Sequence, residues 1–201
     1  MPDTKMPLIV GIGGTAAARS STEQALCAAL DSAAAAGAAT QMFGSAFLNK
    51  LPHYMTEPPG PEAMAFVEAI RAADGIIIAS PGYHGSISGL VKNAIDYLEE
   101  TAKDPRVYLD GVPVGLVATA YGWQATGSTL STLRSIVHAL RGWPTPLGAA
   151  INSSGGIFKD GVCTDAAAAA QLQLVGRQVF EFARLRMLDP SVTETGLDGS
   201  S

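Results

Sequence analysis

The 201-residue sequence has little cysteine, histidine or charge. Its two cysteines, Cys27 and Cys163, are too few for a disulfide framework and lack metal-site spacing, which favours thiols in a reducing compartment. The three histidines have no partner spacing with cysteines or carboxylates, so we predict no metal site. Charged residues make up 15% of the chain, and the net charge is −5 without a basic cluster. These features exclude nucleic acid and anionic membrane surfaces as expected partners.

Long hydrophobic runs are also lacking. No stretch approaches the roughly 20 apolar residues of a membrane span, and the first residues run directly into a short apolar strand without the pattern of a signal peptide. We therefore expect a cytoplasmic protein with no membrane partner. Because 47% of the residues are hydrophobic and no linker or repeat interrupts the chain, residues 1–201 are predicted to form a single domain. Its ordered core is expected at about 7–186, followed by a flexible tail at 187–201.

What the sequence does contain is an alternation of apolar strands and helices. A segment with four prolines, 44–61, is predicted to be a loop. Five strands alternating with five helices predict an α/β protein with a parallel sheet covered on both faces. In such sheets a ligand binds at the carboxyl ends of the strands, so the loops after strands one, three and four are the candidates. The expected strands are 7–12, 40–43, 75–80, 112–120 and 145–151, and the expected helices are 20–36, 62–73, 89–101, 126–140 and 165–186.

The first loop, "GIGGTAAARSSTEQAL" at 11–26, joins a glycine-rich turn to a helix start. Free N–H groups at a helix start, the helix dipole and nearby hydroxyls can hold a phosphate. On this segment alone, a glycine-rich turn with an ordinary serine cap is an equal alternative. The segment lacks the Gly-Lys-Ser/Thr ending of a P-loop and the third glycine of the Rossmann fingerprint. The candidate phosphate-binding residues are Gly14, Thr15, Arg19, Ser20, Ser21 and Thr22.

The second loop, "PGYHGSISGLVKNAIDYLE" at 81–99, is more specific. It resembles the second flavin loop of the NAD(P)H-dependent FMN reductase family, whose pattern is P-x-Y-x-x-S-x-x-G-x-L/F-K-N-x-x-D. The first loop is similar to the G-S/T-x-x-x-x-S phosphate loop of the same family through Gly14, Thr15, Ser20 and Leu26. Two matched loops in the right order extend the resemblance to roughly residues 7–186. The residues of the second loop that fall on the pattern are Pro81, Tyr83, Ser86, Gly89, Lys92, Asn93 and Asp96.

The resemblance implies a flavodoxin-like three-layer sandwich with strand order 2-1-3-4-5. It implies FMN as cofactor and NADPH or NADH as hydride donor, with electrons passing to free flavin, a quinone, an azo compound or a similar small-molecule acceptor. The alternatives are a flavodoxin-type electron carrier with tightly bound FMN and, less compatible with two complete flavin loops, a binding protein that has lost the cofactor. The family also implies a homodimer or homotetramer, with a flavin-dependent monooxygenase as a further candidate partner.

The resemblance also implies the residues at the flavin ring. The backbone of the second loop would pass beside the ring, and no catalytic residue is expected apart from the cofactor site. The third loop, 118–134, departs from the consecutive glycines usual in the family, because Tyr121 and Trp123 flank its glycine. These aromatics would either cover the flavin and narrow acceptor access or pack under a neighbouring subunit. The candidate ring-binding residues are Pro81, Gly82, Tyr83, His84, Gly85, Ser86, Ala120, Tyr121 and Gly122.

Overall fold

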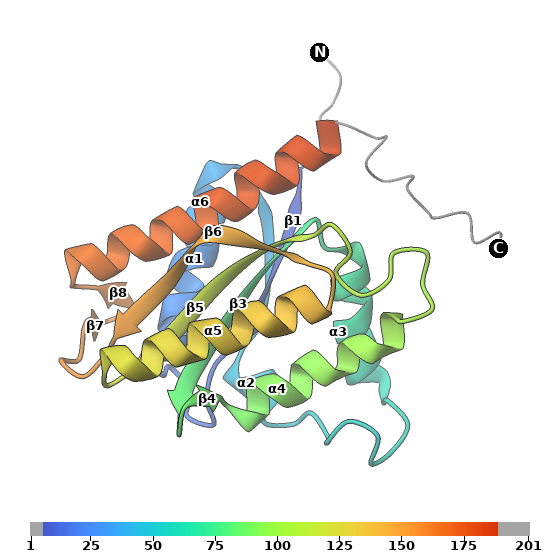
Figure 1. Ribbon diagram of the computed structural model, residues 1–201, viewed down its shortest axis with the longest axis horizontal. Coiled ribbons are helices and arrows are strands. Elements are labelled where there is room, and N and C mark those ends of the chain that lie inside the picture. Colours follow the sequence, from blue (N-terminus) through green and yellow to red (C-terminus); the bar gives the residue numbers. More distant parts are fainter. Residues whose placement is uncertain (1–5, 189–201) are drawn as a thin grey trace.

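Short apolar runs build a parallel sheet in the computed structural model, which describes residues 6–188 (Figure 1). The five long strands lie in the order β2-β1-β3-β5-β6 and all pair in parallel. This order confirms the predicted flavodoxin-like topology. The short strand β4 adds an antiparallel partner to β3, and β7 and β8 form a separate hairpin. The strands are β1 (Leu8–Gly13), β2 (Ala39–Phe43), β3 (Gly75–Tyr83), β4 (Ser86–Ile87), β5 (Pro113–Ala120), β6 (Trp143–Asn152), β7 (Phe158–Lys159) and β8 (Val162–Cys163).

Helices cover both faces of the sheet. Helices α1 and α6 pack on one face, and α3, α4 and α5 pack on the other. Helix α1, for example, is terminated by its C-cap Gly37, whose φ of 112° is the left-handed conformation that glycine adopts at helix ends. The helices are α1 (Ser21–Ala36), α2 (Ser45–Leu48), α3 (Pro61–Ala72), α4 (Gly89–Asp96), the 3₁₀-helix η1 (Tyr97–Thr101), α5 (Trp123–Ala139) and α6 (Ala166–Leu188).

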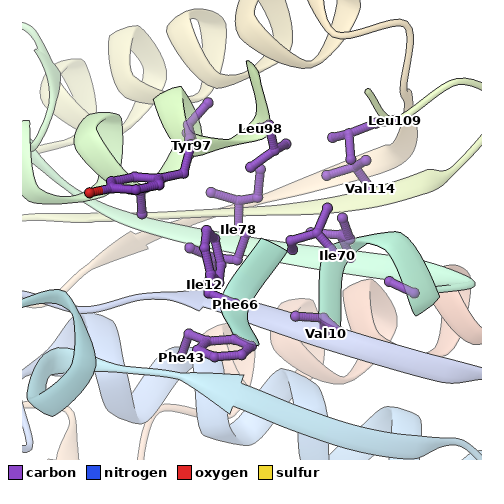
Figure 2. Packing of buried hydrophobic residues seen from close by; sticks show 14 of the residues in the cluster. Val10, Ile12, Phe43, Phe66, Ile70, Ile78, Tyr97, Leu98, Leu109 and Val114 are labelled. Carbon is purple, nitrogen blue, oxygen red and sulfur yellow. The ribbon is translucent and has the colours of Figure 1, made fainter. Parts of the chain in front are cut away.

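Two hydrophobic clusters stabilise the sandwich. Side chains alternate along each strand, so Ile76 and Ile78 enter the cluster under α3–α5, whereas Ile77 enters the cluster under α1 and α6. All three are fully buried. Figure 2 shows the first cluster, in which the rings of Phe43 and Phe66 lie edge to face with centroids 4.9 Å apart. A sheet buried on both faces explains why its strands read as continuous apolar runs.

The structure departs from the sequence-based expectation at several places, among them the unpredicted β7–β8 hairpin. The predicted loop 44–61 contains helix α2, whose four residues are too few for a periodic pattern. Strand β3 continues to Tyr83 and turns back into β4, where a loop was expected. Helix α6 extends to Leu188, past the expected end of the ordered core, and the rest of the predicted tail lies outside the described residues.

Within residues 6–188, no helix combines the length and apolar character needed to cross a membrane. The same part of the chain contains no group of three or more histidine, cysteine or acidic side chains arranged to hold a metal ion.

Candidate functional site

A cavity of about 750 Å³ lies at the carboxyl edge of the sheet, where the loops after β1, β3 and β5 meet. Figure 1 shows the ends of β3 and β6 on this side, beside β4 and the start of α5. Ser153, just after β6, also lines the cavity, and its backbone N–H donates to the Ala120 carbonyl at 2.8 Å. The sequence-predicted residues in the lining are Thr15, Arg19, Ser20, Ser21, Thr22, Pro81, Gly82, Tyr83, Ala120, Tyr121 and Gly122.

The predicted site residues and the cavity lining do not coincide completely. Four predicted site residues, Gly14, His84, Gly85 and Ser86, are not part of the lining. The lining residues that the patterns missed are Ala17, Ala18, Gln24, Thr119, Ala125 and Ser153. Most of these have small side chains, whose types carry no signal for a ligand. Only their positions beside the predicted motifs connect them to the site.

The start of helix α1 forms one end of the cavity. Ser20 is the N-cap, and its Oγ accepts a hydrogen bond from the Glu23 N–H at 3.3 Å. Ser21 and Thr22 occupy the first two helical positions, whose N–H groups have no acceptor inside the helix. Both line the cavity. The serine cap and an anion-binding helix start, which the sequence presented as alternatives, are therefore compatible in one structure.

Two of the predicted phosphate-binding hydroxyls have partners within the protein. Thr15 Oγ1 accepts from the Ala17 N–H and donates to the Ala17 carbonyl, both at 3.1 Å. Thr22 Oγ1 lies 2.6 Å from Thr119 Oγ1, and both threonines are buried. The second contact joins the loop after β1 to the end of β5. The groups that remain available to an anion include the helix-start N–H groups, the Arg19 side chain, and the Ser20 and Ser21 hydroxyls, each of which can still donate a hydrogen bond.

The charge of the lining favours an anionic ligand. Arg19 is the one charged side chain in the lining, which contains no carboxylate. Among the ion pairs of residues 6–188, none involves Arg19. Its guanidinium is therefore free to add positive charge to that of the helix dipole. Among the groups that line the cavity, the Arg19 guanidinium together with the start of α1 is the combination suited to a phosphate.

The second predicted loop is a tight β-hairpin. Tyr83 pairs with Ser86, and the two residues between them, His84 and Gly85, have φ values of 49° and 87°. Two consecutive residues with positive φ define the type I′ turn that matches the twist of paired strands. Since the chain reverses there, Pro81, Gly82 and Tyr83 line the cavity while the tip extends into solvent. This geometry explains why His84, Gly85 and Ser86 lie outside the lining.

The glycines of the two loops allow protein segments to approach one another. A Cβ atom at Gly82 would lie 2.6 Å from Thr129 Oγ1 and 3.1 Å from the Ala125 carbonyl oxygen, both on α5. At Gly14, where φ is 140°, a Cβ atom would lie 2.6 Å from Ser45 Oγ. In this structure the neighbours that require a glycine at these two positions are α5 and α2.

Aromatic side chains surround the entrance of the cavity. Tyr121 is 82% exposed and Tyr83 is 51% exposed, and both belong to the lining. Trp123, the first residue of α5, is 65% exposed and does not belong to it. These rings are therefore accessible to a flat ligand or to another protein surface.

The cysteines provide no activated nucleophile at this site. Burial raises the pKa of the Cys27 thiol, and the nearby charges of Asp31 and Glu23 raise it further. Its Sγ lies 3.5 Å from the Met42 sulfur. A thiol with a raised pKa is a poor nucleophile at neutral pH. Neither Cys27 nor Cys163 lines the cavity.

Fold and site together define a class: a flavodoxin-like α/β protein with unpaired N–H groups at a helix start and an open cavity at the strand ends. The model of the NADPH-dependent FMN reductase family matches residues 7–156, and the chain belongs to that family.

Individual relatives agree with this assignment. The chain is 37% identical over 89 residues to an FMN-dependent NADPH-azoreductase of Staphylococcus haemolyticus, a match that covers 44% of each chain. The chain thus spans less than half the length of this relative. Among solved structures, it is similar to the flavoenzyme NAD(P)H:(acceptor) oxidoreductase of Paracoccus denitrificans, with a TM-score of 0.72, 17% identity and coverage of 90% of this chain and 98% of the other. An oxidoreductase from Corynebacterium diphtheriae gives a TM-score of 0.68 at 22% identity, with coverage of 92% and 98%. These structural matches show the fold.

Proposed function

We propose that the protein is an NAD(P)H-dependent FMN oxidoreductase that passes electrons to a small-molecule acceptor. The observation that carries the proposal is the single cavity that joins the start of α1 to the hairpin after β3, in a chain of the FMN reductase family. Unpaired N–H groups at one end, and the backbone of Pro81 and Gly82 with the exposed Tyr83 and Tyr121 rings elsewhere in the lining, fit a phosphate and a planar ring. The volume of about 750 Å³ lies in the range of cofactor sites.

The lining residues fit FMN in chemistry. The N–H groups of Ser21 and Thr22 and the guanidinium of Arg19 would hold the phosphate, because they are unpaired donors at the α1 end of the lining. The backbone at Pro81 and Gly82 would lie along the ring. When bound, FMN supplies the redox chemistry, and the protein supplies placement and electrostatics. We assign no catalytic side chain in addition to these cofactor-binding groups, since the lining offers no carboxylate, histidine or cysteine.

The open mouth of the cavity supports exchange of two reactants at one face. NADPH or NADH would deliver hydride there and depart, and the acceptor would then occupy the same place. Proximity and orientation account for the rate in such a design. The acceptor classes in our proposal are free flavin, quinones and azo compounds; the azoreductase relative supports the last of these.

We further propose a homodimer or homotetramer, with the exposed aromatic rings at the cavity mouth as part of its contact surface. The exposure of Trp123 and Tyr121 supports this assignment. A cytoplasmic location is consistent with two cysteines that form no disulfide. If free flavin is the acceptor, a flavin-dependent monooxygenase is the partner that would consume the reduced product.

The test combines FMN uptake with anaerobic reduction. Purified protein, loaded with FMN and freed of excess, should show flavin absorption that bleaches when NADPH or NADH is added without oxygen and returns when a quinone or azo dye follows. Bound FMN that does not bleach would identify an electron carrier. A protein that takes up no FMN would overturn the proposal at its foundation.

A further inference from the structure

The loop between β1 and α1 is fixed by hydrogen bonds from side chains that are not part of the G-S/T-x-x-x-x-S pattern of the family. The Glu23 carboxylate accepts two backbone hydrogen bonds: Oε2 from the Arg19 N–H at 2.6 Å and Oε1 from the Ser45 N–H at 2.8 Å. Ser45 is the first residue of α2. A single side chain therefore ties the loop to a helix from another part of the chain.

Arg19 is the residue that most needs this support. Its φ of 56° lies in the left-handed region, which residues with side chains rarely adopt. Both polar backbone groups of Arg19 are held by side chains of α1, because Gln24 Nε2 donates to its carbonyl at 2.8 Å. Without the Glu23 bond, the Arg19 backbone is free to relax toward negative φ. Its guanidinium would then leave the anion end of the cavity.

Helix α2 and the residue after it hold the middle of the same loop. Asn49 Nδ2 donates to the Ala16 carbonyl at 2.9 Å, and Ser45 Oγ donates to the Ala17 carbonyl at 3.3 Å. A trans peptide directs its N–H opposite to its carbonyl, and the described residues contain no cis bond. The Ala18 N–H therefore points away from Ser45. Ala18 itself lines the cavity, which makes this N–H a candidate further donor for an anion.

Glu23 places its negative charge where it does not face a bound anion. It is absent from the cavity lining, and both of its oxygens are directed to N–H groups of Arg19 and Ser45. We propose that Glu23 is a positioning residue: its carboxylate clamps Arg19 and α2 together and thereby holds the loop in its phosphate-binding shape. This inference rests on the proposed function, because it concerns the phosphate of FMN.

The experiment compares FMN with riboflavin, which lacks the phosphate. Dissociation constants are measured by flavin fluorescence for the parent and for Glu23→Gln, whose amide can accept only one of the two bonds well. We expect FMN affinity to fall about tenfold or more, while riboflavin affinity changes less than about threefold. Glu62→Gln is the matched control, because Glu62 lies in the first turn of α3, away from the cavity. It should leave both affinities unchanged.

A second variant and a probe without flavin distinguish a specific effect on the loop from a general loss of folding. Asn49→Ala removes an exposed side chain and should lower the FMN-to-riboflavin affinity ratio by a smaller factor. Inorganic phosphate should raise the melting temperature of the parent, by mass action, and do so less in Glu23→Gln. An unchanged ratio, or equal losses for both flavins, would overturn the positioning role. So would a parent that phosphate does not protect. If FMN binds but NADPH fails to bleach it, the proposed activity fails while the ratio still tests Glu23.

Discussion

The two loops that resemble flavin loops are built in different ways. The loop after β1 is tied to α1 and α2 by hydrogen bonds from Glu23, Ser45 and Asn49. The hairpin formed by β3 and β4 is closed at its base by the Ser88 N–H, which donates to Ser80 Oγ at 3.0 Å, and its tip at His84 and Gly85 is exposed. Both leave the same edge of the sheet and line one cavity. The first is fixed by side chains of other elements, whereas a Cβ atom at Gly85 in the tip of the second would meet nothing within 4 Å.

This difference separates two tasks. A phosphate site needs donors fixed before the anion arrives, because each donor that must be ordered on binding reduces affinity. The braced loop meets that need. A mouth that exchanges a nicotinamide for an acceptor needs access, which the exposed hairpin tip provides. Substitutions in the first loop should therefore change FMN affinity, and those at the hairpin tip should change it little.

The largest effect is expected from Ser21→Pro. Ser21 is the first residue of α1, where proline is well tolerated, and Ser20 already has the extended φ and ψ, −61° and 160°, that proline requires of its predecessor. The variant removes an N–H donor at the helix start while the helix keeps its shape. FMN affinity should fall by about 1.5–3 kcal/mol, measured by fluorescence titration.

Ser21→Ala and riboflavin serve as the controls for this variant. The alanine variant retains the N–H and loses only the hydroxyl, so its FMN affinity should fall less. Riboflavin should bind Ser21→Pro as it binds the parent. Equal FMN affinity in the proline variant and the parent would mean that the helix start does not contact the phosphate. The proposed division between a phosphate-binding first loop and an open hairpin would then be wrong.

An intermediate effect, on stability, is expected from Gly82→Ala. The new Cβ atom would lie 2.6 Å from Thr129 Oγ1 and 3.1 Å from the Ala125 carbonyl oxygen, so α5 must shift. Overpacking of this kind costs about 1–3 kcal/mol in the free energy of unfolding, measured by urea denaturation. Gly85→Ala is the comparison: its Cβ meets nothing within 4 Å, and only its φ of 87° opposes the change. A larger loss at Gly85 than at Gly82 would contradict this account of the hairpin.

Much of the fold is predictable from the sequence because its signals are local. Buried strands such as "GIIIAS" read as apolar runs, and Gly37 marks the end of a helix by its left-handed conformation. The order of the five long strands came from the family resemblance, and the structure confirms it. Helix α2 was not predicted, because four residues are too few to show the hydrophobic periodicity of a helix. The hairpin of β3 and β4 was not predicted, because Tyr83, His84 and Gly85 have the composition of a loop and lack the Asn-Gly pair typical of a type I′ turn.

The site is less predictable, because much of it depends on contacts between distant segments. Glu23 reads as an ordinary acidic residue of a first helical turn, and nothing local indicates that Ser45 lies beside it. Likewise, the partner of Thr22 is Thr119, 97 residues away. A glycine at position 82 indicates that another group lies close to the backbone, but the sequence does not distinguish a ligand from a helix as that neighbour. Such information is present only once the chain has folded.

The smallest effect is expected from His84→Asn at the hairpin tip. His84 has a φ of 49° and is followed by Gly85, so the variant creates the Asn-Gly pair that type I′ turns favour. Because asparagine adopts the left-handed region more readily than histidine, the free energy of unfolding should rise by about 0.5 kcal/mol. His84→Ala, which gains no such preference, should show no increase. Since His84 does not line the cavity, FMN affinity and the rate of anaerobic reduction by NADPH should match the parent in both variants. A changed reduction rate in both would show that the tip reaches the ring, and the hairpin would then belong to the redox site along its whole length.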